Sequence, residues 1–188
     1  MELSLMLSGM CRNGMKMVDV VNDIIATKPF DGGVMLIEKA AHDVGALLRE
    51  VRDAFYPELG RKGLVLVSKV DDGLPHVIID REWISRALSN LMQNAVNYTP
   101  EGGMISLNAE TTFHNMLAIQ VSDSGIGIPR EEHDKIFRKY YRSSAVKGTK
   151  GNGVGLAIVN EVAGAHGGCV EIESIVGVGS TFTLYLPL

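Results

Sequence analysis

The sequence predicts an α+β fold: a two-layer α/β sandwich preceded by an N-terminal helix. Segments with apolar residues at helical spacing are interleaved with short segments in which apolar and polar residues alternate. The alternating segments follow one another through turns, as antiparallel strands do. Apolar residues make up 46% of the 188-residue chain, which is enough for a core shared by one sheet and a layer of helices.

Residues 1–26 carry apolar side chains in a seven-residue rhythm, which predicts a helix. One row of this helix contains Leu3, Met10, Met17 and Ile24. Such a row is a seam for another helix, in this chain or in a partner, but one amphipathic helix packed on its own domain would show it too. The segment KPFDGG at 28–33 breaks the helix and predicts two domains, 1–28 and 29–188.

The second predicted domain begins with a helix over residues 44–55, followed by two β-rich runs at 64–70 and 76–80. The turn DDGLP separates these runs. Asp80 precedes a long helix predicted over residues 81–98. It is well placed to cap that helix, because an aspartate side chain accepts hydrogen bonds from the free N–H groups of a first turn.

Two alternating runs then predict a hairpin connected by TTFHN. The residues that share a face are Ile105, Leu107 and Ala109 in the first run and Leu117, Ile119 and Val121 in the second. Residues 124–152 are polar and loop-like apart from EEHDKIFRKYYR. A helix is predicted from about Val154 to His166, and strands at 169–174 and 180–186 complete the sheet.

Composition and residue spacing argue against several classes of function. A net charge of −4 and a pI near 5.7 give no general reason to bind nucleic acid. Cys11 and Cys169 form no CxxC pair, which favours a reduced, cytoplasmic setting. The histidines lack paired metal-ligand spacing, and no apolar run is long enough to span a membrane, although the parent protein could be membrane-anchored.

Three asparagines lie on the predicted helix 81–98. Asn90, Asn94 and Asn97 are four and three residues apart, so their amides share a face. The apolar stripe of the same helix is formed by Ile84, Leu88, Leu91 and Ala95. The amide face is either an ordinary solvated surface or a site at which amide oxygens coordinate Mg²⁺ beside phosphate groups.

Three glycine-containing segments could also carry chemistry. In VSDSGIGIP, the Asp123 carboxylate could accept a hydrogen bond from an exocyclic amine, and Gly125 and Gly127 allow close approach of a flat base. In GTKGNGVGLAIV, alternate glycines precede a helix, as in loops that hold phosphate, although neither the dinucleotide fingerprint nor the P-loop spacing is present. The third segment is GVGSTF. Each of the three also suits a simple turn.

The order of these segments is more specific than any one of them. NLMQNAVNYTP, DSGIGIP, IFRKYYR, GNGVGLAIV and GVGSTF resemble the N, G1, F, G2 and G3 boxes of the sensor histidine kinase catalytic domain, within the GHKL or Bergerat-fold ATPase superfamily. The resemblance covers about residue 34 to the end of the chain. It implies the Bergerat ATP-binding fold with a mobile lid, and ATP and Mg²⁺ as ligands.

The resemblance also implies a role for each matching residue. Asn94 is similar to the Mg²⁺ ligand, Asn90 to the residue that assists at the metal and phosphates, and Asp123 to the adenine-reading carboxylate. Arg142 matches the arginine at the end of the F box, whose guanidinium reaches the γ-phosphate, so Asn94 and Arg142 are the expected catalytic residues. The rest of the implied nucleotide-binding set is Asn97, Tyr98, Gly125, Gly127, Ile128, Tyr141, Lys150, Gly151, Gly153, Val154, Gly155, Leu156 and Thr181.

Two features depart from the family pattern. Asn97 stands where many relatives have a lysine near the phosphates, so Lys147, Lys150 or Arg138 would have to compensate. No H box with a phosphoacceptor histidine is present, and His42, the nearest candidate, lacks the expected surrounding motif.

The N-terminal segment resembles the end of the second helix of the dimerisation and phosphoacceptor hairpin. Met1 then falls between the two helices of that hairpin. We therefore expect a protein-histidine kinase domain that binds Mg-ATP but cannot autophosphorylate alone. Its expected partners are an acceptor hairpin in cis or in trans, a response regulator receiver domain, and a second copy paired through residues 1–26.

Two other functions within the superfamily compete with this interpretation. Gyrase-type topoisomerases, mismatch-repair ATPases and heat-shock chaperones hydrolyse ATP with a base ahead of the metal-binding asparagine, and no carboxylate stands there in this sequence. The alternative is a nucleotide-dependent partner-binding module like the anti-sigma-type relatives, without kinase activity. The F box favours the kinase.

Overall fold

The computed structural model describes residues 35–70, 73–143 and 152–188, and residues 37–188 form one compact unit. The predicted helix at 1–26, its seam and the predicted boundary after residue 28 lie outside the described residues. None of the helices in the described ranges combines the length and hydropathy needed to cross a membrane.

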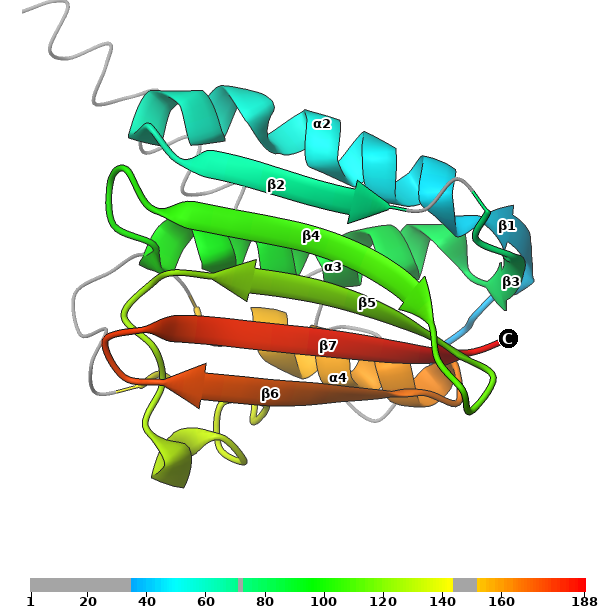
Figure 1. Cartoon of the computed structure of the whole chain (residues 1–188). Coiled ribbons are helices and arrows are strands. Elements are labelled where there is room, and N and C mark those ends of the chain that lie inside the picture. Colours follow the sequence, from blue (N-terminus) through cyan, green and yellow to red (C-terminus); the bar gives the residue numbers. More distant parts are fainter. Residues whose placement is uncertain (1–34, 71–72, 144–151) are drawn as a thin grey trace, which may run out of the picture. The chain divides into compact units, whose positions relative to one another are not determined.

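The compact unit is built on a five-stranded sheet with the order β2-β4-β5-β7-β6 (Figure 1). The strands are β2 (Val65–Val70), β4 (Met104–Thr111), β5 (Met116–Asp123), β6 (Cys169–Ile175) and β7 (Gly179–Pro187). Strands β2 and β4 are parallel, and every other neighbouring pair is antiparallel. The predicted α+β class and the predicted hairpin between β4 and β5 are confirmed.

In the described part of the chain, three α-helices form the second layer of the sandwich (Figure 1). They are α2 (Val44–Lys62), α3 (Arg81–Tyr98) and α4 (Gly155–Ala165). Helix α2 packs against β2 and α3, α3 against β5 and α4, and α4 against β6 and β7. The bounds predicted for α3 are correct, and Asp80 caps it by accepting hydrogen bonds from the backbone N–H groups of Glu82 and Trp83.

The core lies between the sheet and the helices. Leu107, Val121 and Leu184 come from neighbouring strands and are fully buried, as the alternation predicts. The predicted apolar stripe of α3 is buried against them: Ile84, Leu88, Leu91 and Ala95. The same alternation continues to the end of β5, and this places Asp123 on the helix-facing side of the sheet.

Helix α2 is two turns longer than predicted, because it continues past Pro57 to Lys62. A proline removes its own N–H group from the helix ladder and crowds the carbonyl four residues earlier, and burial of Leu59, two residues later, stabilises the extension. Gly63 ends the helix in the left-handed conformation, with a φ of 63°. The extension carries Lys62 to the end of α3.

A second, two-stranded sheet was not predicted. It pairs β1 (Ala40–Asp43) with β3 (His76–Ile79) in antiparallel register. The run at 76–80 therefore does not form a hairpin with the run at 64–70. This small sheet instead ties the segment that enters the compact unit to the start of α3.

Candidate functional site

The amide row of α3 meets the start of α4 at Asn90. A Cβ atom on Gly155 would lie 3.2 Å from Asn90 Oδ1, so the contact depends on a residue without a side chain. Asn90 Nδ2 is buried and has no hydrogen-bond partner among the described residues. An unpaired buried donor is costly unless a ligand or water satisfies it. Asn90 is thus a donor available to an incoming acceptor such as a phosphate oxygen.

Asp123 lies at the carboxyl end of β5, on the side of the sheet that faces the helices. Burial raises the pKa of its carboxyl group, and hydrogen bonds from the N–H groups of Gly125 and Ser180 offset part of that rise. The Gly125 N–H group lies 2.8 Å from Asp123 Oδ1. The Asp123 carboxylate is thus a hydrogen-bond acceptor that water solvates poorly. A ligand with a hydrogen-bond donor can supply the interaction that water does not.

The loop after Asp123 is locked against the end of α3. The Ile126 N–H group donates to the carbonyl of Tyr98 at 3.3 Å. A Cβ atom at Gly125 would lie 2.6 Å from that same carbonyl oxygen, so only glycine fits. The acceptor on β5 and the amides of α3 are consequently held in a fixed relation.

The second glycine of this loop is needed for a different contact. Gly127 has a φ of 69°, and a Cβ atom there would lie 2.1 Å from the carbonyl oxygen of Ile175. The next residue, Ile128, donates its N–H to Ser174 Oγ at 2.8 Å. The loop is therefore also fixed to β6, and both predicted glycines have structural reasons that do not require a ligand.

One predicted residue, Thr181, does not share the side of the sheet that carries Asp123. Its hydroxyl donates to Ser122 Oγ at 2.9 Å, and the pair lies on the opposite side of the sheet. Because side chains alternate along a strand, the residue that faces the helices with Asp123 is Ser180, which is buried and bonds Ser174 Oγ at 2.9 Å. Thr181 stays a predicted nucleotide-binding residue, but its side chain lies on the other side of the sheet from Asp123. Counting back by two from the apolar Phe182 would have selected Ser180.

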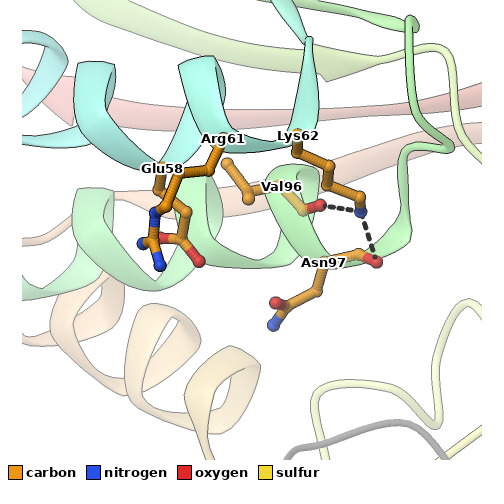
Figure 2. Close-up of a pocket in the computed structure, with 5 residues that line it drawn as sticks. All are labelled: Glu58, Arg61, Lys62, Val96 and Asn97. Carbon is orange, nitrogen blue, oxygen red and sulfur yellow. Dashed lines mark hydrogen bonds between the residues drawn. The ribbon is translucent and has the colours of Figure 1, made fainter.

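The last carbonyls of α3 are all paired. Thr99 donates to the carbonyl of Ala95 through its N–H at 3.0 Å and its hydroxyl at 2.6 Å. Lys62 Nζ donates to the carbonyls of Val96 at 2.5 Å and Asn97 at 3.2 Å (Figure 2). The final carbonyl, that of Tyr98, accepts the N–H group of Ile126 in the loop after Asp123. A cation at a helix C-terminus also offsets the negative end of its dipole.

Asn97 faces a pocket between α2 and α3 with a volume of 240 Å³. The pocket is lined by Glu58, Arg61, Lys62, Val96 and Asn97 (Figure 2). Gln93 Nε2 lies 3.3 Å from Asn97 Oδ1 and 3.2 Å from Glu58 Oε1. Two of the three predicted amides are thus separated: Asn90 contacts α4, whereas Asn97 is tied toward α2. Asn94 lies half-buried between them along the helix.

The segment EEHDKIFRKYYR forms a short 3-10 helix, η2 (Arg130–Glu132), and then turns. It is bonded to the residues that lead into α4, because the Tyr140 N–H group donates to the Gly153 carbonyl at 2.8 Å. Gly153 has a φ of 69°, and a Cβ atom there would lie 2.7 Å from the carbonyl oxygen of Tyr141. Arg142 follows as an exposed residue.

The remaining predicted residues divide by their place in the chain. Val154 occupies the N-cap position of α4 and is buried, and Leu156, in the first turn of α4, is half-buried. Lys147, Lys150 and Gly151 lie outside the described residues. Within the described ranges, no group of three or more His, Cys, Asp or Glu side chains could hold a metal. The oxygens of Asn90 and Asn94 remain the candidate Mg²⁺ ligands, and amide oxygens fit this cation.

Sequence comparisons place this architecture among known proteins. Residues 79–188 match the family described as Histidine kinase-, DNA gyrase B-, and HSP90-like ATPase. The chain is 32% identical over 173 residues to the adaptive-response sensory kinase SasA of Synechococcus sp. (strain JA-3-3Ab), covering 92% of this chain and 46% of that protein. It is also 32% identical over 176 residues to the sensor histidine kinase WalK of Bacillus subtilis (strain 168), covering 92% and 28%.

Solved structures agree with the sequence relatives. Full-length ShkA in complex with AMPPNP superposes with a TM-score of 0.83 at 27% identity, covering 94% of this chain and 36% of that one. The catalytic domain of the histidine kinase ThkA superposes with a TM-score of 0.69 at 28% identity, covering 80% and 97%.

The chain belongs to the Histidine kinase-, DNA gyrase B-, and HSP90-like ATPase family. Within it, the compact unit corresponds to the catalytic domain of sensor histidine kinases, as the five boxes led us to expect. The chain spans less than half the length of SasA and of WalK.

Proposed function

We propose that this chain binds Mg-ATP and donates the γ-phosphoryl group to a histidine on a helical hairpin, as the catalytic half of a sensor histidine kinase. The observation that carries the proposal is that helix α3 holds both the Asp123 loop, at Tyr98, and the start of α4, at Asn90. The loop is bonded to the last residue of α3, and Gly155 touches Asn90 on the same helix. ShkA, with 27% identity, binds AMPPNP.

Each part of the proposed site acts on a defined part of Mg-ATP. Asp123 accepts a hydrogen bond from the exocyclic amine of adenine. The N–H groups at the start of α4 face the phosphates, and the unpaired Asn90 Nδ2 donates to a phosphate oxygen. Asn90 and Asn94 hold Mg²⁺, which neutralises charge on the β- and γ-phosphates when bound. Tyr98 borders this site at the end of α3.

The proposed reaction transfers a phosphoryl group between two partners. A ring nitrogen of the acceptor histidine attacks the γ-phosphorus, a nitrogen–phosphorus bond forms, and the bond from that phosphorus to the bridging oxygen of ADP breaks. Arg142, which is exposed beside the residues leading into α4, offsets charge on the γ-phosphoryl oxygens. The chain supplies position and electrostatics, and ADP is the leaving group.

The proposed partners follow from the reaction. The acceptor hairpin is supplied in cis or in trans, and its phosphohistidine passes the group to a response regulator receiver domain. ThkA has been solved in complex with the response regulator protein TrrA. We also propose a cytoplasmic location, a parent that could be membrane-anchored, and pairing of two copies through residues 1–26.

Transfer of radiolabel from [γ-³²P]ATP tests this function. The acceptor is a complete phosphoacceptor helical hairpin fused to this chain. Acid-labile, base-stable label on the hairpin, lost in an Asn94→Ala variant that still folds, is the expected result. Nucleotide binding without any label would favour the second candidate, a partner-binding module in which ATP only orders the lid. The kinase is favoured because SasA and WalK are named kinases.

A further inference from the structure

A buried histidine lies outside the proposed site and takes part in no step of the proposed reaction. His166 follows the last residue of α4, and only 3% of its surface is exposed. Its Nδ1 atom lies 2.8 Å from the carbonyl oxygen of Val162, and the Asp80 N–H group donates to its Nε2 atom at 2.9 Å. Because Nε2 accepts, the proton of the neutral ring is on Nδ1 and is donated to Val162.

Asp80, which bonds His166, joins three segments of the chain. Its N–H group binds the end of α4, and its Oδ1 atom caps the start of α3. Its Oδ2 atom accepts the N–H group of Glu38 at 2.9 Å. Glu38 lies where the chain enters the compact unit, two residues before β1. We call the two hydrogen bonds that link Asp80 to His166 and to the Glu38 N–H group the entry junction.

The entry junction and the contact at Asn90 fix the same two helices at two points. Along α3, ten residues separate Asp80 from Asn90, and along α4, eleven separate Gly155 from His166. At 1.5 Å per residue these intervals are about 15 Å and about 16.5 Å. The helices therefore touch at matching positions: Asp80 with His166, and Asn90 with Gly155. Rigid helices held at one end keep their register at the other.

We infer that Asp80 and His166 are positioning residues for the nucleotide site, and that the Glu38–Asp80 hydrogen bond makes this positioning depend on the segment entering the unit. The inference rests on the proposed function, because its readout is ATP affinity. Loosening the entry junction frees α4 to move against α3. ATP binding must then also order the contact between α3 and α4, and the free-energy cost of this ordering lowers the affinity for ATP. Every group that touches ATP is still present.

A pair of substitutions at Glu38 isolates the bond. Glu38→Pro removes the backbone N–H donor, whereas Glu38→Ala removes the side chain and keeps that donor. The affinity of each full-length variant for Mg-ATP is measured by calorimetry, and its Tm is measured without nucleotide. We expect Glu38→Pro to bind ATP about threefold to tenfold more weakly than Glu38→Ala, which should match the wild type.

Variants of His166 test whether both bonds act through one junction. His166→Phe removes both ring hydrogen bonds, and His166→Gln keeps an acceptor for the Asp80 N–H group. We expect ATP affinity to fall in the first and to be partly restored in the second. Combined with Glu38→Pro, His166→Phe should cost less than the product of the two separate losses.

The outcomes separate this inference from the proposed function. If the wild type binds no ATP, the proposed function fails first. If the wild type binds ATP, but Glu38→Pro and Glu38→Ala bind it equally within twofold, the entry junction does not position the site. A lower Tm in Glu38→Pro with equal affinity has the same meaning, because the bond then stabilises only the fold. If the loss of ATP affinity in the double variant equals the product of the two single losses, the two bonds act independently, and this result would also contradict a shared junction.

Discussion

Replacing Asp123 by asparagine should move ATP affinity and stability in opposite directions. The change keeps the shape of the side chain and removes its charge. In the nucleotide-free protein the carboxylate is poorly solvated, and burial raises its pKa despite the N–H groups of Gly125 and Ser180. Ionisation of this group is therefore less favourable in the folded protein than in the unfolded chain, so the charge on Asp123 costs stability at pH 7. An asparagine removes that cost.

The effect on ATP follows from the hydrogen bond that Asp123 would accept. A hydrogen bond to a charged group contributes about 1.5–3 kcal/mol. Its loss corresponds to about 10- to 150-fold weaker binding. The amide of asparagine also presents a donor, which would face the donor of the adenine amine. We therefore expect a large fall in ATP affinity together with a higher Tm for the nucleotide-free protein.

Calorimetric titration with Mg-ATP and thermal unfolding without nucleotide measure the two effects. Asp53→Asn is the matched control, because Asp53 is an exposed carboxylate of α2 paired only with its neighbour Arg52 among the described contacts. It should change neither quantity appreciably. ATP affinity of Asp123→Asn within threefold of the wild type would refute the assigned role. A lower Tm in that variant would refute the reasoning about burial.

Three further predictions follow from the same structure. Lys62→Met leaves two carbonyls of α3 unpaired and should lower the free energy of unfolding by about 1.5–3 kcal/mol, whereas Arg61→Met should not; equal losses in urea unfolding would contradict this. Gly127→Ala should destabilise strongly and lower Tm, because its Cβ would meet the Ile175 carbonyl oxygen at 2.1 Å; an unchanged Tm would contradict the assigned contact. Burial lowers the pKa of His166 from 6.5, so the unfolded chain binds this proton more readily, and stability should fall as pH drops below about 6.5; a His166→Gln variant should lose that part of the pH dependence.

Much of the fold could be predicted because its signals are local. The bounds of α3 and its cap at Asp80 follow from a polar N-cap ahead of an apolar stripe at helical spacing. The buried sides of β4 and β5 follow from alternation. The end of α2 could not be found in this way, because a proline is a local stop signal and burial of Leu59, two residues later, overrides it.

The parts of the site that depend on distant contacts could not be predicted. Lys62 reaches the end of α3 only because α2 and α3 pack side by side, and His166 meets Asp80 across 86 positions of sequence. The two glycines after Asp123 approach the backbone of Tyr98 and of Ile175, which are far from them in sequence, so these contacts could not be predicted either. The alternation of β7 does contain the signal that Ser180, and not Thr181, shares a side of the sheet with Asp123.

Every step of the proposed function requires Mg-ATP to bind at α3. Calorimetric titration of ATP into the wild-type chain and into Asn94→Ala, each with Mg²⁺ and with EDTA, tests it. We predict binding that is tighter with Mg²⁺ in the wild type and an Asn94→Ala variant in which Mg²⁺ gives little or no gain. Absence of ATP binding by the wild type, or a Mg²⁺ effect that is the same in both proteins, would contradict the account.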